Sequence, residues 1–299
     1  MAKKHITFTN GAARRQYIIL MMLFRLAFNR YLYGIFTRSL ARFFSSDNAA
    51  FLKLPSGENF KVYLNDGYWT RFLLFGGSYE PEIADVIQAA AGKTNVFCDL
   101  GANTGFWTVY AANLFDKITA IEASSDTYQK LTENTRNLRN VSRRWAAVYS
   151  ESNKELQFIN TLNSHASSRL GNKPNKTDSV ETVETVAIDD VLKPGETALI
   201  KLDVEGAEVD AIDGAKRALS EGSVIIYEDH GSDQSCKPSA HLLSMSNISL
   251  YSCENPPQKL ENIDDVVALK QDRYRGYNFL AAHENSPLLT SILQGFAIH

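Results

Sequence analysis

The sequence predicts an α/β fold: a doubly wound, mostly parallel sheet preceded by an N-terminal helical extension. From Val96 onward, short apolar runs of strand length alternate with helical patterns, as in a parallel sheet with helices on both faces. The first of these strands leads into a turn with two glycines, and a helical pattern follows directly. Acidic residues end three of the strands, where such a sheet forms its ligand crevice.

The composition is that of an ordinary globular protein. The chain has 299 residues, of which 44% are hydrophobic and 22% are charged, enough for one large domain with an extension. Its formal net charge of -3 gives no general case for nucleic-acid binding. The three cysteines form no C-x-x-C motif, which argues against a disulfide framework and a zinc site and favours a reduced, intracellular location.

The N-terminal segment differs from the rest in charge. Residues 1–44 hold eight basic residues and no acidic one, whereas the remaining residues hold the other 23 basic residues and all 34 acidic ones. The apolar run Tyr17–Phe28 is interrupted by Arg25 and is too short to span a membrane. We expect residues 1–50 to form a basic, apolar helical arm, and residues 51–299 to form the main domain, with a core at about 78–282.

Two interpretations of this arm stay open. It could lie as amphipathic helices on an anionic membrane surface, giving peripheral membrane contact through residues 1–44. Alternatively, it packs on the main domain or on a second subunit of a homo-oligomer. We therefore expect the protein in the cytoplasm. If the arm lies on a membrane, we expect it at the inner membrane surface.

The elements follow in order from the patterning. A hairpin over Phe51–Leu64 turns at Pro55-Ser56-Gly57, and a helix begins near Pro81 and ends before Gly92. Later strands are expected at Val96–Cys98, Ile118–Glu122, Val141–Val148, Leu156–Ile159, Val180–Ala187, Ala198–Leu202, Val224–Tyr227 and Asn278–Ala282. Helices are expected at Thr104–Phe115, Asp126–Leu138, Ile188–Leu192, Glu208–Leu219 and Ser239–Met245. The polar stretch Asn160–Ser179 has no clear pattern, and we expect it to form a loop that covers a substrate.

The glycine turn is the first candidate binding site. Asp99 stands two residues before Gly101, and Gly105 follows four residues later, so the spacing differs from the G-x-G-x-x-G of dinucleotide-binding proteins. Glycine lets the backbone turn sharply and approach a ligand closely. Glu122 ends the next strand, where a carboxylate can accept hydrogen bonds from both hydroxyls of a ribose. This combination resembles the first motifs of class I S-adenosylmethionine (SAM) methyltransferases, which have a Rossmann-like fold.

Acidic residues mark a second candidate site. A strand ending at Leu202 delivers Asp203, and Glu205 and Glu208 follow as the chain turns into a helix. Another strand delivers Glu228, Asp229 and His230 to the same edge. Such acids could act as general base, metal ligands or hydrogen-bonding partners of a substrate. For Glu208, a solvated acid in the first turn of a helix is the alternative.

Several segments together resemble the FkbM family of SAM-dependent methyltransferases. The matching segments, which cover about Ser78 to Ala282, are DLGANTGFWT, IEAS, KLDVEGAEVDAIDGA, the last acid of IIYED, YEPE and ASSRL. The resemblance implies O-methylation of a sugar or polyketide hydroxyl, with a small-molecule or glycan acceptor. The residues that it places around SAM are Asp99, Gly101, Ala102, Asn103, Gly105, Glu122, Ala123 and Ala146. The chain departs from the family at Ser124, where proline is common, and at His230, which follows the strand-end acid.

Methyl transfer to a sugar hydroxyl requires help from the protein, because the hydroxyl is a poor nucleophile. We expect Asp203 to be the base, with Glu205 and His230 as the other catalytic candidates. A divalent cation such as Mg²⁺ could assist on Asp203 and Glu228. The rival hypotheses are a non-catalytic regulator that binds SAM or a nucleotide and an NAD-dependent oxidoreductase. A nucleic-acid methyltransferase is disfavoured because the main domain is acidic.

Overall fold

The computed structural model describes residues 6–26, 45, 47–75, 79–160, 169–170, 179–272 and 276–296. The chain forms two compact units, Met1–Glu80 and Pro81–His299, called unit 1 and unit 2 below. The boundary lies at residue 80, whereas the sequence led us to place it at residue 50. The difference arises because residues before and after position 50 share one small sheet.

The described residues of unit 1 form a three-stranded antiparallel sheet and two helices. The strands are β1 (Ile6–Phe8), β2 (Ala49–Lys53) and β3 (Asn59–Tyr63), in the order β1-β2-β3, and the helices are α1 (Gly11–Leu26) and α3 (Gly67–Phe75). The predicted hairpin is thus confirmed as β2 and β3. Leu20 of α1, Phe60 and Trp69 are buried. None of the helices in the described part of the chain has the length and apolar character needed to cross a bilayer.

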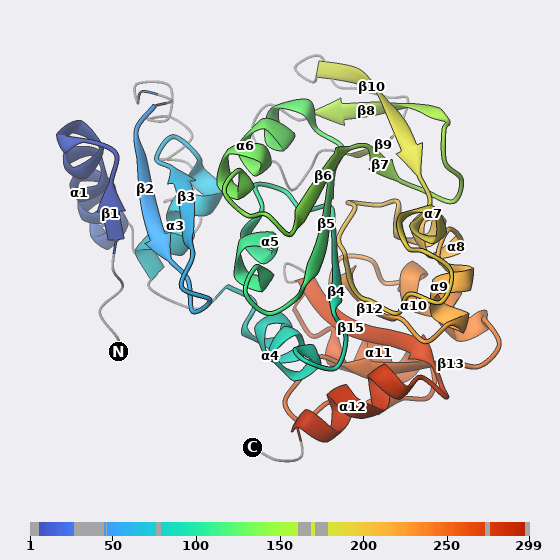
Figure 1. Ribbon diagram of the computed structural model, residues 1–299. Helices are drawn as coiled ribbons and strands as arrows, with labels where there is room; N and C mark the ends of the chain where they lie inside the picture. The colour runs from blue at the N-terminus through green and yellow to red at the C-terminus, as the bar shows by residue number, and fades with distance from the viewer. Residues whose placement is uncertain are drawn as a thin grey trace. The chain divides into compact units, whose positions relative to one another are not determined.

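Unit 2 is built on an eight-stranded sheet in the order β14-β13-β15-β12-β11-β4-β5-β6 (Figure 1). The five strands from β12 to β6 are parallel, and β13, β14 and β15 are antiparallel to their neighbours. These strands are β4 (Val96–Leu100), β5 (Lys117–Glu122), β6 (Val141–Trp145), β11 (Leu199–Leu202), β12 (Val224–His230), β13 (Ile248–Ser252), β14 (Lys259–Leu260) and β15 (Gly276–His283). The predicted α/β class and mostly parallel sheet are therefore confirmed.

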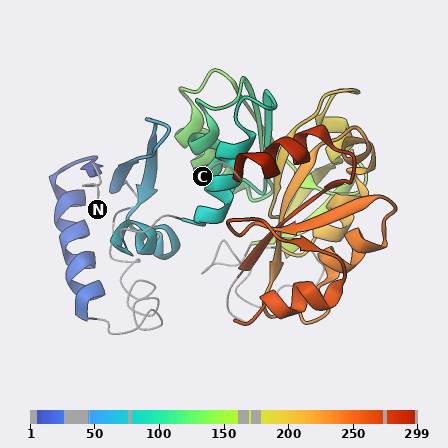
Figure 2. The ribbon, with the colours of Figure 1, turned by 90° about the horizontal axis from the view of Figure 1, so that it is seen from below.

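Helices cover both faces of this sheet. On one side lie α4 (Pro81–Ala90), α5 (Phe106–Ala111) and α6 (Ser125–Thr135), and α12 (Pro287–Phe296) packs beside α4 (Figures 1 and 2). On the other side lie α8 (Glu208–Asp213), α9 (Lys216–Ser220) and α10 (Lys237–Ser244). The remaining helices are α7 (Ile188–Val191) and α11 (Ile263–Leu269). The central strands β4 and β11 are wholly buried between the two helical layers and lie at the centre of the core.

A second, four-stranded sheet of unit 2 has the order β7-β10-β8-β9. Its strands are β7 (Ala147–Val148), β8 (Glu155–Asn160), β9 (Arg169–Leu170) and β10 (Ser179–Val186). The antiparallel pairing of β8 with β10 confirms the predicted hairpin-like pair. Most of the stretch that we expect to form a covering loop, residues 161–168 and 171–178, lies outside the described residues.

The structure corrects several predicted boundaries. The strand expected over Val141–Val148 breaks at Ala146, and its two parts join different sheets. The helix expected over Glu208–Leu219 is two helices, α8 and α9, because the backbone at Gly214 and Ala215 is not helical. Helix α6 begins at Ser125, one residue before the predicted start, and Ser124 caps it by accepting the Thr127 N–H. The elements β13, β14, α11 and α12 were not predicted.

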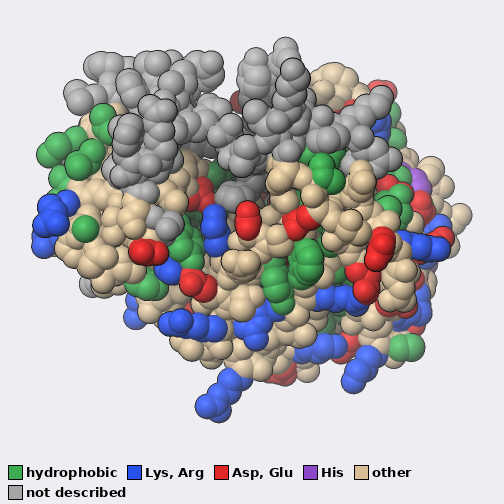
Figure 3. Space-filling view, turned by 90° about the horizontal axis from the view of Figure 1, so that it is seen from above, with side chains coloured by type: hydrophobic (Ala, Val, Ile, Leu, Met, Phe, Trp, Pro, Cys, Tyr) green, Lys and Arg blue, Asp and Glu red, His purple; other side chains and the backbone are tan. Residues whose placement is uncertain are grey.

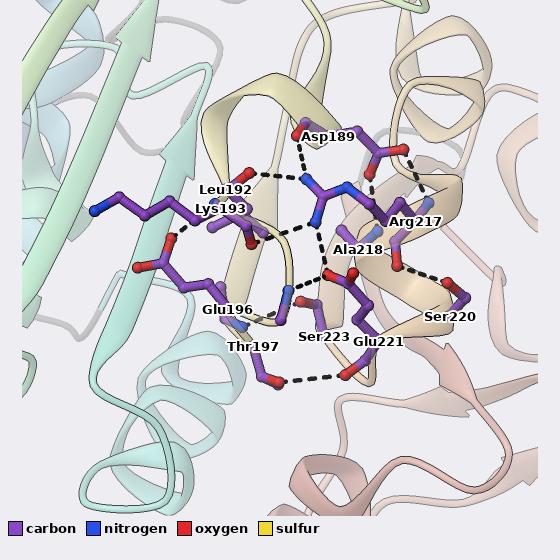
Figure 4. Close-up of polar contacts among 12 residues, drawn as sticks. Asp189, Leu192, Lys193, Glu196, Thr197, Arg217, Ala218, Ser220, Glu221 and Ser223 are labelled. Carbon is purple, nitrogen blue, oxygen red and sulfur yellow. Dashed lines mark hydrogen bonds and ion pairs between the residues drawn. The ribbon is translucent and has the colours of Figure 1, made fainter.

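A network around Arg217 of α9 lies before the amino end of β11 (Figure 4). Its guanidinium donates to Glu221 Oε2 at 2.6 Å, to Leu192 O at 2.8 Å and to the Asp189 carbonyl. The Asp189 carboxylate in turn accepts the N–H groups of Arg217 and Ala218 at 2.9 and 2.8 Å. The network joins α7, α9 and the loop before β11. It therefore holds the start of β11, at the end of that strand opposite to Asp203.

Candidate functional site

The predicted residues gather at the carboxyl ends of β4, β5, β11 and β12. In chain order the sheet starts at β4, extends through β5 and β6 on one side, and then continues with β11 and β12 on the other. The strand order therefore reverses between β4 and β11, which is where doubly wound sheets bind ligands. The Asp203 N–H donates to Leu100 O at 2.9 Å, so the loops after these two strands lie directly against each other.

The glycine turn after β4 is shaped by contacts within the protein. Gly101 has a φ of +77°, and a Cβ there would lie 1.7 Å from Asp203 O. Gly105 has a φ of +89°, and its Cβ would lie 2.7 Å from Leu131 Cδ1 of α6. Glycine is thus required at Gly101 because the backbone after β11 passes so close. From the sequence we expected glycine at this position because a ligand would approach the backbone closely.

Glu122 ties the end of β5 to this turn. Its side chain is buried, Oε2 accepts the Asn103 N–H at 2.8 Å, and Oε1 accepts the Ser124 N–H at 2.9 Å. Asn103 holds a left-handed φ of 51°, and its side-chain oxygen accepts the Thr104 N–H. The carboxylate is therefore already oriented by the backbone before any ligand binds.

A cavity of about 610 Å³, counting the space open to solvent, lies beside the turn and is called the glycine-turn cavity. Five of the eight residues predicted around SAM line it: Gly101, Asn103, Glu122, Ala123 and Ala146. The lining residues that the sequence did not identify include Ser124, Thr127, Val148 and Phe158. Phe158 comes from β8 of the second sheet, and no local pattern could have linked it to the turn.

Asp99, Ala102 and Gly105 are not among the residues that line this cavity. Asp99 is buried within the protein, where its Oδ2 accepts the Thr108 hydroxyl at 2.6 Å. Its other oxygen, Oδ1, has no hydrogen-bond partner among the described residues. Burial raises the pKa of Asp99, and the nearby ammonium of Lys201 and the Thr108 hydroxyl partly offset this effect.

Lys201 is a site residue that the sequence analysis missed. It lies in the middle of β11, opposite Asp99 of β4, with 6% of its side chain exposed. Its Nζ donates to Asp203 Oδ2 at 3.0 Å, and 27% of the Asp203 side chain stays exposed. The lysine within the otherwise apolar strand LIKL could have revealed it, because a buried ammonium requires an acidic partner nearby.

A second cavity, of about 980 Å³ counting the space open to solvent, adjoins the first and is called the acidic cavity. Asp203 and Glu205 line both cavities. The other residues that line the acidic cavity are Gly206, Glu208, Val209, Glu228, Asp229, His230, Ser232, Asp233, Lys237 and Pro238. The structure thus brings together the two groups of predicted acids and His230.

The acids around this cavity interact unfavourably with one another. Glu205 has a left-handed φ of 51°, and desolvation followed by the charges of Asp203, Glu228 and Glu208 raises its pKa. Burial also raises the pKa of Glu208, although its carboxylate accepts the Gly206 N–H at 2.9 and 3.0 Å. Carboxylates that destabilise one another in this way are typical of functional sites.

His230 and Asp229 differ in their surroundings although they are neighbours. His230 is exposed, and its Nδ1 accepts the Ser232 N–H at 3.1 Å, which leaves the proton of the neutral ring on Nε2. The Asp229 carboxylate is buried, 2.6 Å from Lys270 Nζ, and accepts the Ser239 hydroxyl at 2.7 Å. The candidate site predicted from these strand-end residues therefore keeps His230 and Glu228, while the Asp229 carboxylate belongs to a buried ion pair.

The comparisons with known proteins agree with this geometry. The model of the methyltransferase FkbM domain matches residues 99–278. The chain belongs to the FkbM methyltransferase family. The hexuronic acid methyltransferase AglP of Haloferax volcanii is 27% identical to it over 179 residues, which cover 57% of this chain and 70% of that protein. The resemblance drawn from the sequence motifs is thereby confirmed.

Solved structures also resemble this FkbM methyltransferase. The FkbM methyltransferase of Methylobacillus flagellatus is 16% identical with a TM-score of 0.39, and the match covers 83% of this chain but only 59% of that one. The precorrin-6y C5,15-methyltransferase of Geobacter metallireducens is 15% identical with a TM-score of 0.39, and the match covers 66% of this chain and 85% of that one.

The metal prediction finds no further support in this FkbM methyltransferase. Among the described residues, no three His, Cys, Asp or Glu side chains gather in a way that could hold a metal ion. Asp203 and Glu228 do line the same cavity, but Asp203 already accepts a hydrogen bond from Lys201. The described donor set therefore falls short of a site for Mg²⁺.

Proposed function

We propose that this methyltransferase uses SAM to methylate a hydroxyl of a sugar, carried on a glycan, a glycolipid or a similar secondary metabolite. The observation that carries the proposal is the pair of adjoining cavities that share Asp203 and Glu205. A transferase needs a donor and an acceptor side by side, with the group that assists the transfer between them. The name of the related AglP, a hexuronic acid methyltransferase, supports a sugar as the acceptor.

The residues of the glycine-turn cavity fit SAM. Two backbone N–H groups hold Glu122 where it lines the cavity, and its carboxylate would accept the two ribose hydroxyls. Ala123 and Ala146 are small and leave room for a flat base, and Phe158 adds an aromatic side chain to the lining. SAM bound there would supply the methyl group. Gly101 and Asn103 would border the rest of the molecule.

Asp203 is the residue that we assign to the acceptor hydroxyl. It lies where the two cavities meet, and the buried Lys201 holds one of its oxygens. A carboxylate fixed in this way can accept the proton that the hydroxyl loses as its oxygen is methylated. Glu205 and His230 also line the acidic cavity and would orient the sugar through hydrogen bonds. Each of these roles needs a polar acceptor with several hydroxyls, which a sugar provides.

The substitution Asp203→Asn tests this assignment. We expect turnover of a sugar acceptor to be abolished while the affinity for SAM, measured by calorimetry, stays within severalfold of the wild type. Asp213→Asn is the matched control, because Asp213 pairs with Lys216 outside both cavities. Turnover by Asp203→Asn at the wild-type rate would refute the assignment. Tight SAM binding by a wild type that methylates no acceptor would instead indicate a non-catalytic regulator.

The charge of the acidic cavity further restricts the acceptor. Among the described residues, its lining includes Asp203, Glu205, Glu208, Glu228 and Asp233, and Lys237 is the lysine found there. Bringing a negatively charged sugar into such surroundings is unfavourable, so we propose a neutral or amino sugar rather than a uronic acid. Methyl glucoside and methyl glucuronide should be compared as acceptors. We expect at least about tenfold higher kcat/KM for the neutral glycoside, and a preference for the glucuronide would contradict the proposal.

A further inference from the structure

Helix α1 of unit 1 buries one face and exposes another. Ala13, Gln16 and Leu20 are buried, and the Gln16 side-chain oxygen accepts Asn48 Nδ2–H at 2.7 Å, which fixes this face against the sheet of unit 1. The opposite face exposes Ile18, Ile19 and Met22, with 42%, 48% and 60% of their surfaces accessible. The orientation of the helix is therefore set by contacts within unit 1.

The exposed face is unusually apolar for this protein. Among the described residues six large hydrophobic side chains are exposed, and three of them are Ile18, Ile19 and Met22. Residues three and four positions apart are neighbours on a helix, so these three side chains adjoin one another. The other three, Trp145, Val180 and Val267, lie on separate elements. Clustered exposed apolar side chains indicate a contact surface.

Arginines continue the same strip. Arg14 and Arg15 are exposed and lie one turn before Ile18 and Ile19, so basic and apolar side chains share one face. Figure 3 shows hydrophobic side chains next to Lys and Arg side chains on the surface of unit 1, at the left edge of the view. Gly11–Leu26 contains no acidic residue.

We propose that this strip, formed by Arg14, Arg15, Ile18, Ile19 and Met22, binds the surface of an anionic membrane. Apolar side chains with neighbouring arginines match a lipid surface, where the apolar groups enter between the headgroups and the cations meet lipid phosphates. The whole segment of residues 1–44 is basic, which strengthens this charge complementarity. The proposal rests on unit 1 alone and does not depend on the proposed function.

A second copy of the chain fits the strip less well. Pairing two α1 helices would place arginines in an interface without any acid from either helix to neutralise them. Three exposed apolar side chains also supply far less than the roughly 800 Å² per partner that a stable protein interface buries. Self-association is therefore an outcome that the experiment must be able to detect.

Vesicle binding of the full-length chain tests the proposal. The protein is sedimented with vesicles of phosphatidylcholine alone and with vesicles of phosphatidylcholine and phosphatidylglycerol in equal parts. We expect binding only to the second kind, and a decrease when sodium chloride is added, because salt screens the attraction of the arginines. Absence of binding to the anionic vesicles would overturn the proposal.

The triple variant Ile18→Gln, Ile19→Gln, Met22→Gln locates the binding. All three side chains are exposed, so the variant should fold, as circular dichroism can verify. We expect its affinity for the anionic vesicles to fall at least about tenfold. The double variant Val180→Gln, Val267→Gln is the matched control, because it removes equally exposed apolar groups elsewhere and should bind like the wild type.

Two results with the triple variant would refute the assignment to this strip. One is unchanged vesicle binding, which would place the contact elsewhere in the chain. The other comes from sedimentation velocity without vesicles: a wild-type dimer that the triple variant converts to a monomer would make the strip a self-association surface.

Discussion

The ammonium of Lys201 lies 3.0 Å from Asp203 Oδ2, at the carboxyl end of β11. Only 6% of the Lys201 side chain is exposed, whereas Asp203 reaches into both cavities. The buried charge is thus directed at the acid that we assign to the acceptor hydroxyl. Such an arrangement holds the carboxylate in one orientation, and it explains why a lysine occupies the middle of a core strand.

Replacing this lysine tests its role in orienting Asp203. We expect Lys201→Met to lower kcat for a sugar acceptor at least about tenfold, because Asp203 loses the group that orients it. The melting temperature should fall as well, because Asp203 and the buried Asp99 lose the cation beside them, so kcat is compared at a temperature at which the variant is folded. Lys216→Met, which removes the exposed pair with Asp213, is the control and should leave kcat unchanged. An unaltered kcat in Lys201→Met would rule out the positioning role.

The contact between Gly101 and the Asp203 backbone predicts a large loss of stability on substitution. In Gly101→Ala the new Cβ would lie 1.7 Å from Asp203 O, so the loops after β4 and β11 must separate, at a cost of more than about 3 kcal/mol. Gly195→Ala is a matched control, since Gly195 has nearly the same φ, +78° against +77°, with no atom within 4 Å. Its cost should be about 1–2 kcal/mol.

Urea unfolding of the two glycine variants measures this difference. If the two midpoints fall by the same amount, backbone conformation alone explains the glycine at position 101. A lower midpoint for Gly101→Ala would confirm that the two loops must pass in close contact.

The double backbone contact of Glu122 makes a prediction about the donor. Glu122→Ala should weaken SAM binding by about 1–3 kcal/mol, because two buried hydroxyls lose their acceptor and the Asn103 N–H loses its partner. Glu181→Ala is the control: its carboxylate also accepts a backbone N–H, that of Ser125 at 3.0 Å, but it does not line the cavity. Calorimetric titration giving equal affinities for the wild type and Glu122→Ala would remove Glu122 from the donor site.

The network around Arg217 should matter for stability and not for ligand binding. Arg217→Met removes charge-assisted bonds to Glu221 and to the carbonyls of Leu192 and Asp189, so we expect a loss of about 2–3 kcal/mol in the free energy of unfolding. Arg144→Met breaks only an exposed pair with Glu184 and should cost less than about 1 kcal/mol. SAM affinity should be unaffected in both, and a selective loss of SAM affinity in Arg217→Met would contradict this division of roles.

The sequence could predict those parts of the site that depend on strand ends. Glu122 and Asp203 each follow an apolar run directly, and parallel strands place such residues at one edge of the sheet. The glycine spacing located the turn and, with Glu122, separated it from dinucleotide-binding motifs. These features are local, so patterning alone reveals them. Which residues hold SAM stays a prediction.

Other parts depend on contacts between distant residues and have no local signal. Gly101 is adjacent to the backbone of a residue about a hundred positions later, and Asp229 pairs with Lys270, 41 positions away. Phe158 reaches the cavity from a second sheet that the sequence did not reveal as separate. Short elements were missed for another reason: β14 has two residues, too few for any periodicity.

The repulsion among the acids of the cavity gives a pH dependence of stability. The pKa of Glu205 is raised from its ordinary value of 4.5 by desolvation and by Asp203, Glu228 and Glu208. Above that ordinary value the folded chain binds more protons at this site than the unfolded chain does, so Glu205 lowers the stability increasingly as the pH rises toward the raised pKa. Below it, Glu205 is protonated in both states and has no effect.

Glu205→Gln should therefore raise the melting temperature at about pH 8 and leave it nearly unchanged at about pH 4. The glutamine keeps the shape of the side chain and removes the charge that Asp203 and Glu228 oppose. Glu155→Gln, an exposed change on β8 outside the cavity, is the control for a general effect of removing one negative charge. The same gain at both pH values, or a gain in Glu155→Gln as large as in Glu205→Gln, would show that repulsion within the cavity is not the cause.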